Sequence, residues 1–110
     1  IIKRLIYRGV WLRKNLINRG YQVIEVYPYA TKVLLFGDQV PAKKNPACLP
    51  FLRERMGTLI NGLDPHVSGL NHDRCDALLT AYTGYLHQGH RTDSLGLIEE
   101  GVIALPHLHH

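Results

Sequence analysis

In most of this 110-residue chain the apolar residues are spaced as in helices, and only short segments are typical of strands. Apolar residues recur at helical intervals in four segments, residues 2–19, 29–36, 48–61 and 72–87. Strands are expected in two places: residues 21–27, which are branched and aromatic and end at Pro28, and residues 95–106, which predict two short strands with a turn near Glu100 and Gly101. The resulting order, one helix, one strand, three helices and two strands, predicts an α/β fold.

The number of strands is small for this many helices. A lone strand between helices cannot form a stable sheet, and the first helix begins without a capping residue. We therefore expect residues 1–106 to be a single partial domain, the C-terminal part of a mixed sheet flanked by helices, with its N-terminal strands missing. Exposed sheet edges in such a domain can pair chains into oligomers. Residues 107–110, His-Leu-His-His, resemble the start of an expression tag and are set aside as a tail.

Small residues predict where two of the helices approach the sheet. Gly9 lies in the apolar stripe of the first helix and would allow close approach to a strand, while Gly20 is a suitable residue to end that helix. In the helix over 72–87, Asn71 is the expected N-cap. One side of that helix is small and is expected to pack on the sheet; its residues are Ala77, Thr80, Ala81 and Gly84.

Charge is distributed unevenly along the chain. Residues 1–55 contain eleven Lys or Arg and three acids, a net charge of +8, whereas residues 56–110 contain two Arg and six acids, a net charge of −4. A basic half suits contact with phosphates, although an ordinary basic surface is the alternative.

The two cysteines have no metal-like spacing, which favours a reducing, cytoplasmic location. Because no apolar run approaches membrane-spanning length, a membrane partner is not expected.

Three carboxylates are candidates for a metal site. Asp73 and Asp76 are three residues apart at the start of a helix, so both lie on one face. Glu25 is the only acid of the strand over 21–27, between branched apolar residues. One acid on a strand and two on a helix can bind Mg²⁺ or Mn²⁺, which prefer oxygen ligands. Two such ions would activate water for phosphodiester hydrolysis.

Each of these acids also has a simpler interpretation. Acids are favoured in the first turn of any helix by the helix dipole, which accounts for Asp73 and Asp76 without a metal. Glu25 can be an edge-strand residue that faces water or pairs with an arginine. Nucleic-acid contacts are expected from Lys43, Lys44 and Arg53, with tyrosines available for stacking, although any one of these cations can equally be a solvated surface residue.

Four pieces of the chain, in order, resemble the family named domain of unknown function 429, described as predicted nucleases of the ribonuclease H-like fold. They are residues 23–32 with Glu25-Val-Tyr-Pro28, the Lys43-Lys44 pair, residues 72–83 with Asp73-x-x-Asp76-Ala-Leu, and residues 100–106. The resemblance covers most of residues 11–106. It implies a mixed five-stranded sheet flanked by helices, whose first three strands form an antiparallel meander.

The resemblance also implies roles for the three acids. In related Holliday-junction resolvases, a strand glutamate and an Asp-x-x-Asp helix pair bind magnesium together with an aspartate of the first strand. Glu25 matches the strand acid, and Asp73 with Asp76 matches the helix pair, as catalytic and metal-binding residues. Nothing in this chain matches the first-strand aspartate. The resemblance therefore implies an incomplete ligand set and no activity for this chain by itself.

Two functions follow as expectations. The first is a magnesium-dependent nuclease or resolvase-like phosphodiester hydrolase that acts on nucleic acid. The second is a non-catalytic module on the same fold that binds nucleic acid or protein. Magnesium binding discriminates between them, because only the hydrolase requires the ion.

Overall fold

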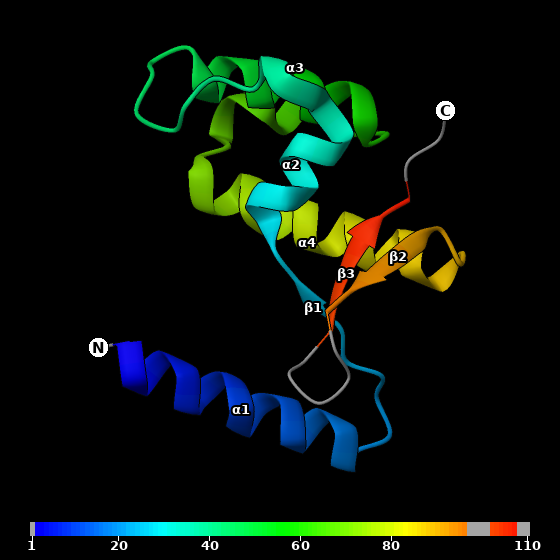
Figure 1. Ribbon diagram of the computed structural model, residues 1–110. Coiled ribbons are helices and arrows are strands. Elements are labelled where there is room, and N and C mark those ends of the chain that lie inside the picture. The colour runs from blue at the N-terminus through cyan, green and yellow to red at the C-terminus, as the bar shows by residue number, and fades with distance from the viewer. Residues whose placement is uncertain (1, 97–101, 108–110) are drawn as a thin grey trace.

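The computed structural model describes residues 2–96 and 102–107 as a mixed α/β arrangement (Figure 1). The α-helices are α1 (Ile2–Asn18), α2 (Pro28–Phe36), α3 (Cys48–Leu59) and α4 (His72–Gln88). Two short 3₁₀ helices, Gly37–Gln39 and Asp64–Gly69, lie in the connections before and after α3. The strands are β1 (Glu25–Val26), β2 (Thr92–Leu95) and β3 (Ile103–Pro106).

The three strands form one small mixed sheet in the order β1-β3-β2. β1 pairs parallel with β3, with Glu25 opposite Ile103, and β2 pairs antiparallel with β3, with Ser94 opposite Ala104. The two strands predicted near the C-terminus are thus confirmed, although the first of them begins at Thr92 rather than at Leu95. The predicted turn at Glu100 and Gly101 lies outside the described residues.

The helix predictions agree closely with the structure, and their ends have local causes. Gly20 ends α1 with a φ of 88°, and the amide of Tyr21 donates to the carbonyl of Leu16 at 3.0 Å while that of Gly20 donates to Ile17. This is the Schellman arrangement, which requires a left-handed residue and therefore favours glycine. Asn71 caps α4 as predicted, because its Oδ1 accepts from the amide of Arg74 at 2.8 Å.

The predicted strand over 21–27 is too long. Only Glu25 and Val26 form a ladder, and Pro28 already begins α2. Within the described residues β1 has one neighbouring strand, β3, whose register matches just these two positions. Branched and aromatic residues favour extended backbone, but only a partner strand can supply the hydrogen bonds of a sheet.

The hydrophobic core lies among the helices rather than on the sheet. It joins α3, α4 and the segment between them, with apolar side chains of α2 packed against its edge. Its buried members are Cys48, Leu52, Met56, Leu70, Cys75 and Leu79. Leu86 of α4 and Ala104 of β3 are also buried, on two elements that contact each other. The helices α2, α3 and α4 therefore form one packed body to which the sheet is attached.

The small side of α4 does not face the sheet, so that prediction is wrong. Ala77, Thr80 and Ala81 are exposed, and a Cβ at Gly84 would meet no atom within 4 Å. The buried side is instead the larger one, with Cys75, Leu79, Thr83 and Leu86. Burying the larger apolar side chains removes more apolar area from water, which outweighs the closer approach that small residues allow.

Helix α1 stands apart from the other helices, on the other side of the sheet (Figure 1). It makes only sparse contacts with the other elements, and a Cβ at Gly9 would meet nothing within 4 Å. The prediction that Gly9 brings this helix close to the sheet is therefore wrong for the described residues. Apolar spacing defines a face on a helix, but it does not supply a surface to cover that face. No helix in the described part of the chain is both long and apolar enough to cross a membrane.

Candidate functional site

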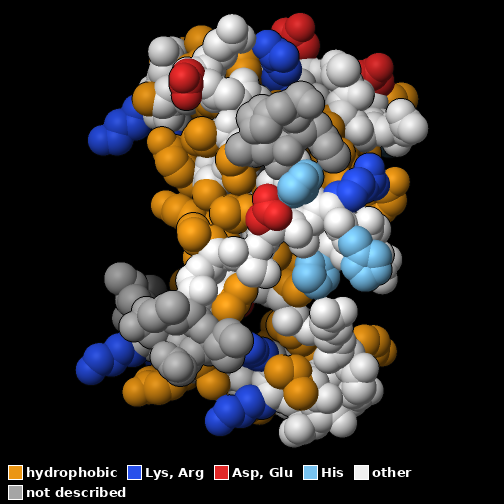
Figure 2. All heavy atoms as spheres, turned by 45° about the vertical axis from the view of Figure 1, so that its right-hand side comes forward, with side chains coloured by type: hydrophobic (Ala, Val, Ile, Leu, Met, Phe, Trp, Pro, Cys, Tyr) orange, Lys and Arg blue, Asp and Glu red, His pale blue; other side chains and the backbone are white. Residues whose placement is uncertain are grey.

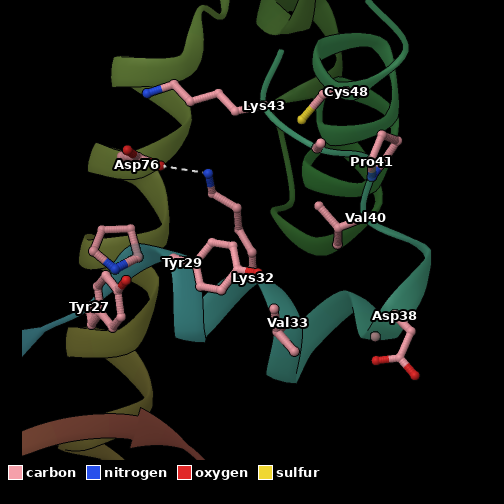
Figure 3. Close-up of a pocket in the computed structure, with 13 residues that line it drawn as sticks. Tyr27, Tyr29, Lys32, Val33, Asp38, Val40, Pro41, Lys43, Cys48 and Asp76 are labelled. Carbon is pink, nitrogen blue, oxygen red and sulfur yellow. Dashed lines mark ion pairs between the residues drawn. The ribbon is translucent and has the colours of Figure 1, made fainter. Parts of the chain in front are cut away.

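A pocket of about 430 Å³ lies between the start of α2, the loop after the 3₁₀ helix Gly37–Gln39, and α4 (Figure 3). This volume falls within the range of small-molecule sites in proteins. The side chains with chemistry to offer come from three separate stretches of sequence. They are Tyr27, Tyr29, Lys32, Asp38, Lys43, Cys48 and Asp76.

An ion pair crosses the pocket wall between α2 and α4. The Nζ of Lys32 lies 3.1 Å from Oδ1 of Asp76, and the two side chains are 11% and 35% exposed. Lys32 is the only charged residue of α2, and its burial is tolerable because a carboxylate neutralises the ammonium group. The pair therefore joins α2 to α4 along one wall of the pocket.

Asp76 has acceptor capacity beyond this contact. Its Oδ1 is buried, and among the described residues this oxygen has no hydrogen-bond partner, since the Lys32 contact is close but poorly directed. Lys43 extends toward the same part of α4 from the loop above it (Figure 3). Two ammonium groups thus reach toward one carboxylate, and with Asp38, which also lines the pocket, the four charged side chains balance.

Two tyrosines stand beside the lysines at the start of α2. The rings of Tyr27 and Tyr29 have centroids 6.1 Å apart and are tilted by 38°, and both side chains are exposed. Pro28 between them occupies the first helical position, where its fixed φ and missing amide fit. Thr31 is buried and donates its hydroxyl to the carbonyl of Tyr27 at 3.2 Å, which holds this corner in place.

Glu25 does not join the other two acids. Its Oε1 accepts a hydrogen bond from Nη1 of Arg13 at 2.9 Å, and both side chains are about half exposed. The interpretation of Glu25 as an arginine-paired edge residue is therefore the one the structure shows. Within residues 2–96 and 102–107, no three His, Cys, Asp or Glu side chains gather closely enough to hold a metal ion.

Asp73 and Asp76 lie on the same helix, but their side chains have different surroundings. Asp73 is exposed in the first turn of α4, where the helix dipole favours a carboxylate. Asp76, one turn further, points into the pocket. Only Asp76 of the three predicted metal ligands therefore lines the pocket.

The three predicted nucleic-acid contacts also differ. Lys43 lines the pocket, and Lys44 is exposed next to it. Arg53 donates from Nε and Nη2 to the carbonyl of Leu70 at 3.0 and 2.7 Å, which ties α3 to the segment before α4. Arg53 thus uses two of its donors inside the domain, and Lys43 is the best placed of the three for a ligand.

Two buried thiols lie close to the pocket. Cys48 lines it, and Cys75 is fully buried one residue before Asp76. Burial raises the pKa of the Cys75 thiol above its ordinary value, and the nearby Lys32 ammonium opposes this shift only in part. Cys75 is therefore a small core residue rather than a thiolate ligand, and Cys48 lies in the same hydrophobic core.

Sequence reasoning missed Lys32. The available signal was a single charge within the apolar segment Pro28–Phe36, because a lone lysine on a short apolar helix needs a counter-ion if that helix is buried. The partner could not be identified, since Asp76 is 44 positions away in the sequence.

Comparisons with models of known protein families, with curated proteins and with solved structures gave no match to this chain.

Proposed function

We propose that this chain is a nucleic-acid-binding module that takes a single strand into the pocket between α2 and α4. The observation that carries the proposal is that Lys43 and two exposed tyrosines line one pocket (Figure 3). Ammonium groups contact backbone phosphates, and tyrosine rings stack on bases of any sequence. The net charge of +8 on residues 1–55 supports a polyanionic ligand.

The pocket favours binding over catalysis with the residues described. Lys32 is already neutralised by Asp76, so Lys43 is the cation available to a phosphate. The volume of about 430 Å³ suits a nucleotide unit rather than a duplex. Because base stacking is sequence-tolerant, we expect affinity to depend strongly on salt and weakly on sequence.

A charge-removal pair of variants tests this function. We expect Lys43→Gln to weaken binding of a labelled single-stranded oligonucleotide several-fold and to reduce the slope of log affinity against log salt by about 0.7, the value for one contact to a single strand. Lys44→Gln is the matched control, because it removes the same charge from the adjacent exposed position outside the pocket. Fluorescence anisotropy over a salt series measures both, and equal effects of the two changes would contradict binding in the pocket.

A metal-dependent nuclease or resolvase-like hydrolase is the second candidate, on a ribonuclease H-like fold. Its support is Asp76, a pocket carboxylate whose buried Oδ1 lies 3.1 Å from Nζ of Lys32 and accepts no hydrogen bond from the described residues. The parallel pairing of β1 with β3, and α4 packed against β3, are compatible with that fold. Glu25 and Asp73 would have to move toward Asp76, or other acids would have to complete the site, before Mg²⁺ or Mn²⁺ could act there.

The hydrolase candidate predicts a requirement for both metal and Asp76. With Mg²⁺ or Mn²⁺ present, we expect Asp76→Asn to reduce cleavage of branched, single-stranded or hybrid substrates at least about 100-fold, as loss of a charge-stabilising group does. Circular dichroism establishes that the variant is folded. Isothermal titration of the unsubstituted protein with Mg²⁺ provides a second readout, and cleavage that persists unchanged in Asp76→Asn would remove this residue from the reaction.

A further inference from the structure

The outward side of α1 combines exposed aromatic rings with cations. Tyr7 and Trp11 are 70% and 65% exposed. They are four residues apart, so they lie one turn apart on the same side of the helix, with an axial separation of about 6 Å. Lys3, Arg4 and Arg8 share a shallow hollow with them.

This side of α1 is distinct from its aliphatic side. Arg13 pairs with Glu25 of β1, and Ile6, Val10 and Leu16 line a separate hollow with residues 23–25. Ile6 and Val10 face toward the strand but remain 57% and 46% exposed, whereas the two rings lie among the cations on the opposite side. Tyr7 and Trp11 line one hollow together rather than lying scattered, and contiguous exposed apolar patches mark contact sites for a ligand or partner.

The charge of α1 specifies the chemistry of that ligand. The helix carries five Lys or Arg and no acid, and Glu25 is the first acidic residue in the sequence. In Figure 2, Lys and Arg side chains lie beside hydrophobic ones on the lower part of the molecule, where α1 is located. A polyanion complements this surface, and the two rings at its centre can stack on bases, which is a contact that phosphate groups cannot make.

A single-stranded nucleic acid fits these observations better than an anionic lipid surface. Helices that lie on membranes bury a continuous aliphatic face and keep their cations on the other side. In α1 the aliphatic side is itself largely exposed and lies opposite the rings, so a helix that lay on lipid by that side would leave Tyr7 and Trp11 in water without a contact. Alternating phosphate and base, as in a single strand, matches a surface on which cations and rings alternate.

We propose that the outward face of α1, formed by Lys3, Arg4, Tyr7, Arg8 and Trp11, is a second contact site for single-stranded nucleic acid. Tyr7 and Trp11 stack on successive bases, and the three cations contact the flanking phosphates. This inference rests on the proposed nucleic-acid-binding function and adds a site separate from the pocket between α2 and α4.

The single tryptophan of the chain reports directly on this face. We expect titration of the full chain with an oligothymidylate of about 16 nucleotides to quench the fluorescence of Trp11, because the base stacks on the indole. By anisotropy, Tyr7→Leu and Trp11→Leu should each weaken binding about tenfold, the effect of losing one stacked base. Arg4→Gln combined with Arg8→Gln should reduce the salt slope by about 1.4, corresponding to two phosphate contacts.

Tyr21→Leu is the matched control, since Tyr21 is an exposed tyrosine beyond the end of α1. The affinity of this variant for the oligonucleotide should be unchanged. Binding that depends on Lys43 while Trp11 emission and the Tyr7 and Trp11 variants stay unaffected would overturn the α1 site and leave the pocket proposal standing. Absence of any binding to the oligonucleotide would overturn both. A blue shift of Trp11 with phosphatidylserine vesicles, without quenching by the oligonucleotide, would assign the face to lipid and overturn the inference.

Discussion

Leu79→Ala is expected to lower the free energy of unfolding by about 3 kcal/mol, the typical cost of truncating a fully buried leucine. Leu79 has no exposed surface and lies in the cluster that joins α3 to α4. Truncation removes apolar contacts and leaves a cavity between the two helices. For a domain of this size, the melting temperature should fall by about 12 to 24 °C, measured by circular dichroism.

Leu5→Ala is the matched control for this substitution. Leu5 is 71% exposed on α1, so the same truncation should change the free energy of unfolding by less than about 0.5 kcal/mol. A loss at Leu5 as large as the loss at Leu79 would show that α1 is covered in solution. It would therefore contradict the isolated position of this helix.

Asp76→Ala is expected to destabilise the protein by about 2 to 3 kcal/mol, more than Lys32→Met does. Removing the carboxylate leaves the ammonium group of Lys32, whose side chain is 11% exposed, without a counter-ion. Removing the lysine leaves a carboxylate that is 35% exposed and can still be hydrated, so about 1 kcal/mol is expected. Urea denaturation gives both free energies.

The double variant Lys32→Met with Asp76→Ala separates the ion pair from the packing around it. Replacing both charges with apolar groups should recover most of the stability lost in Asp76→Ala, because no buried charge remains. If the double variant is as unstable as the sum of the single changes, the two side chains do not interact. In that case the ion pair would not be what joins α2 to α4.

Local sequence signals account for most of the secondary structure. The helical spacing of apolar residues predicts segments 48–61 and 72–87, which form α3 and α4, although the side that α4 buries was predicted wrongly. Gly20 and Asn71 act at helix ends through backbone geometry and a side-chain cap, which depend on residues only a few positions away. These features could be predicted because their physical causes lie within one or two turns of the chain.

Predictions that needed a partner were less successful. Residues 21–24 do not continue β1, because the length of a strand depends on its neighbour. Gly9 and Gly84 were expected at close contacts with the sheet, yet neither position approaches another element. Apolar or small faces can be identified from sequence, but which surfaces meet them depends on the whole fold.

The candidate site was likewise only partly predictable from the sequence. Lys43 and Asp76 were recognised as residues with suitable chemistry, whereas Lys32 was not, and Glu25 was expected beside Asp76. The sequence by itself determined the helices, their caps and the basic character of residues 1–55. Only the tertiary structure decided that Glu25 pairs with Arg13 and that Asp76 pairs with Lys32, because the packing of α2 against α4 places groups from distant positions within ion-pair distance.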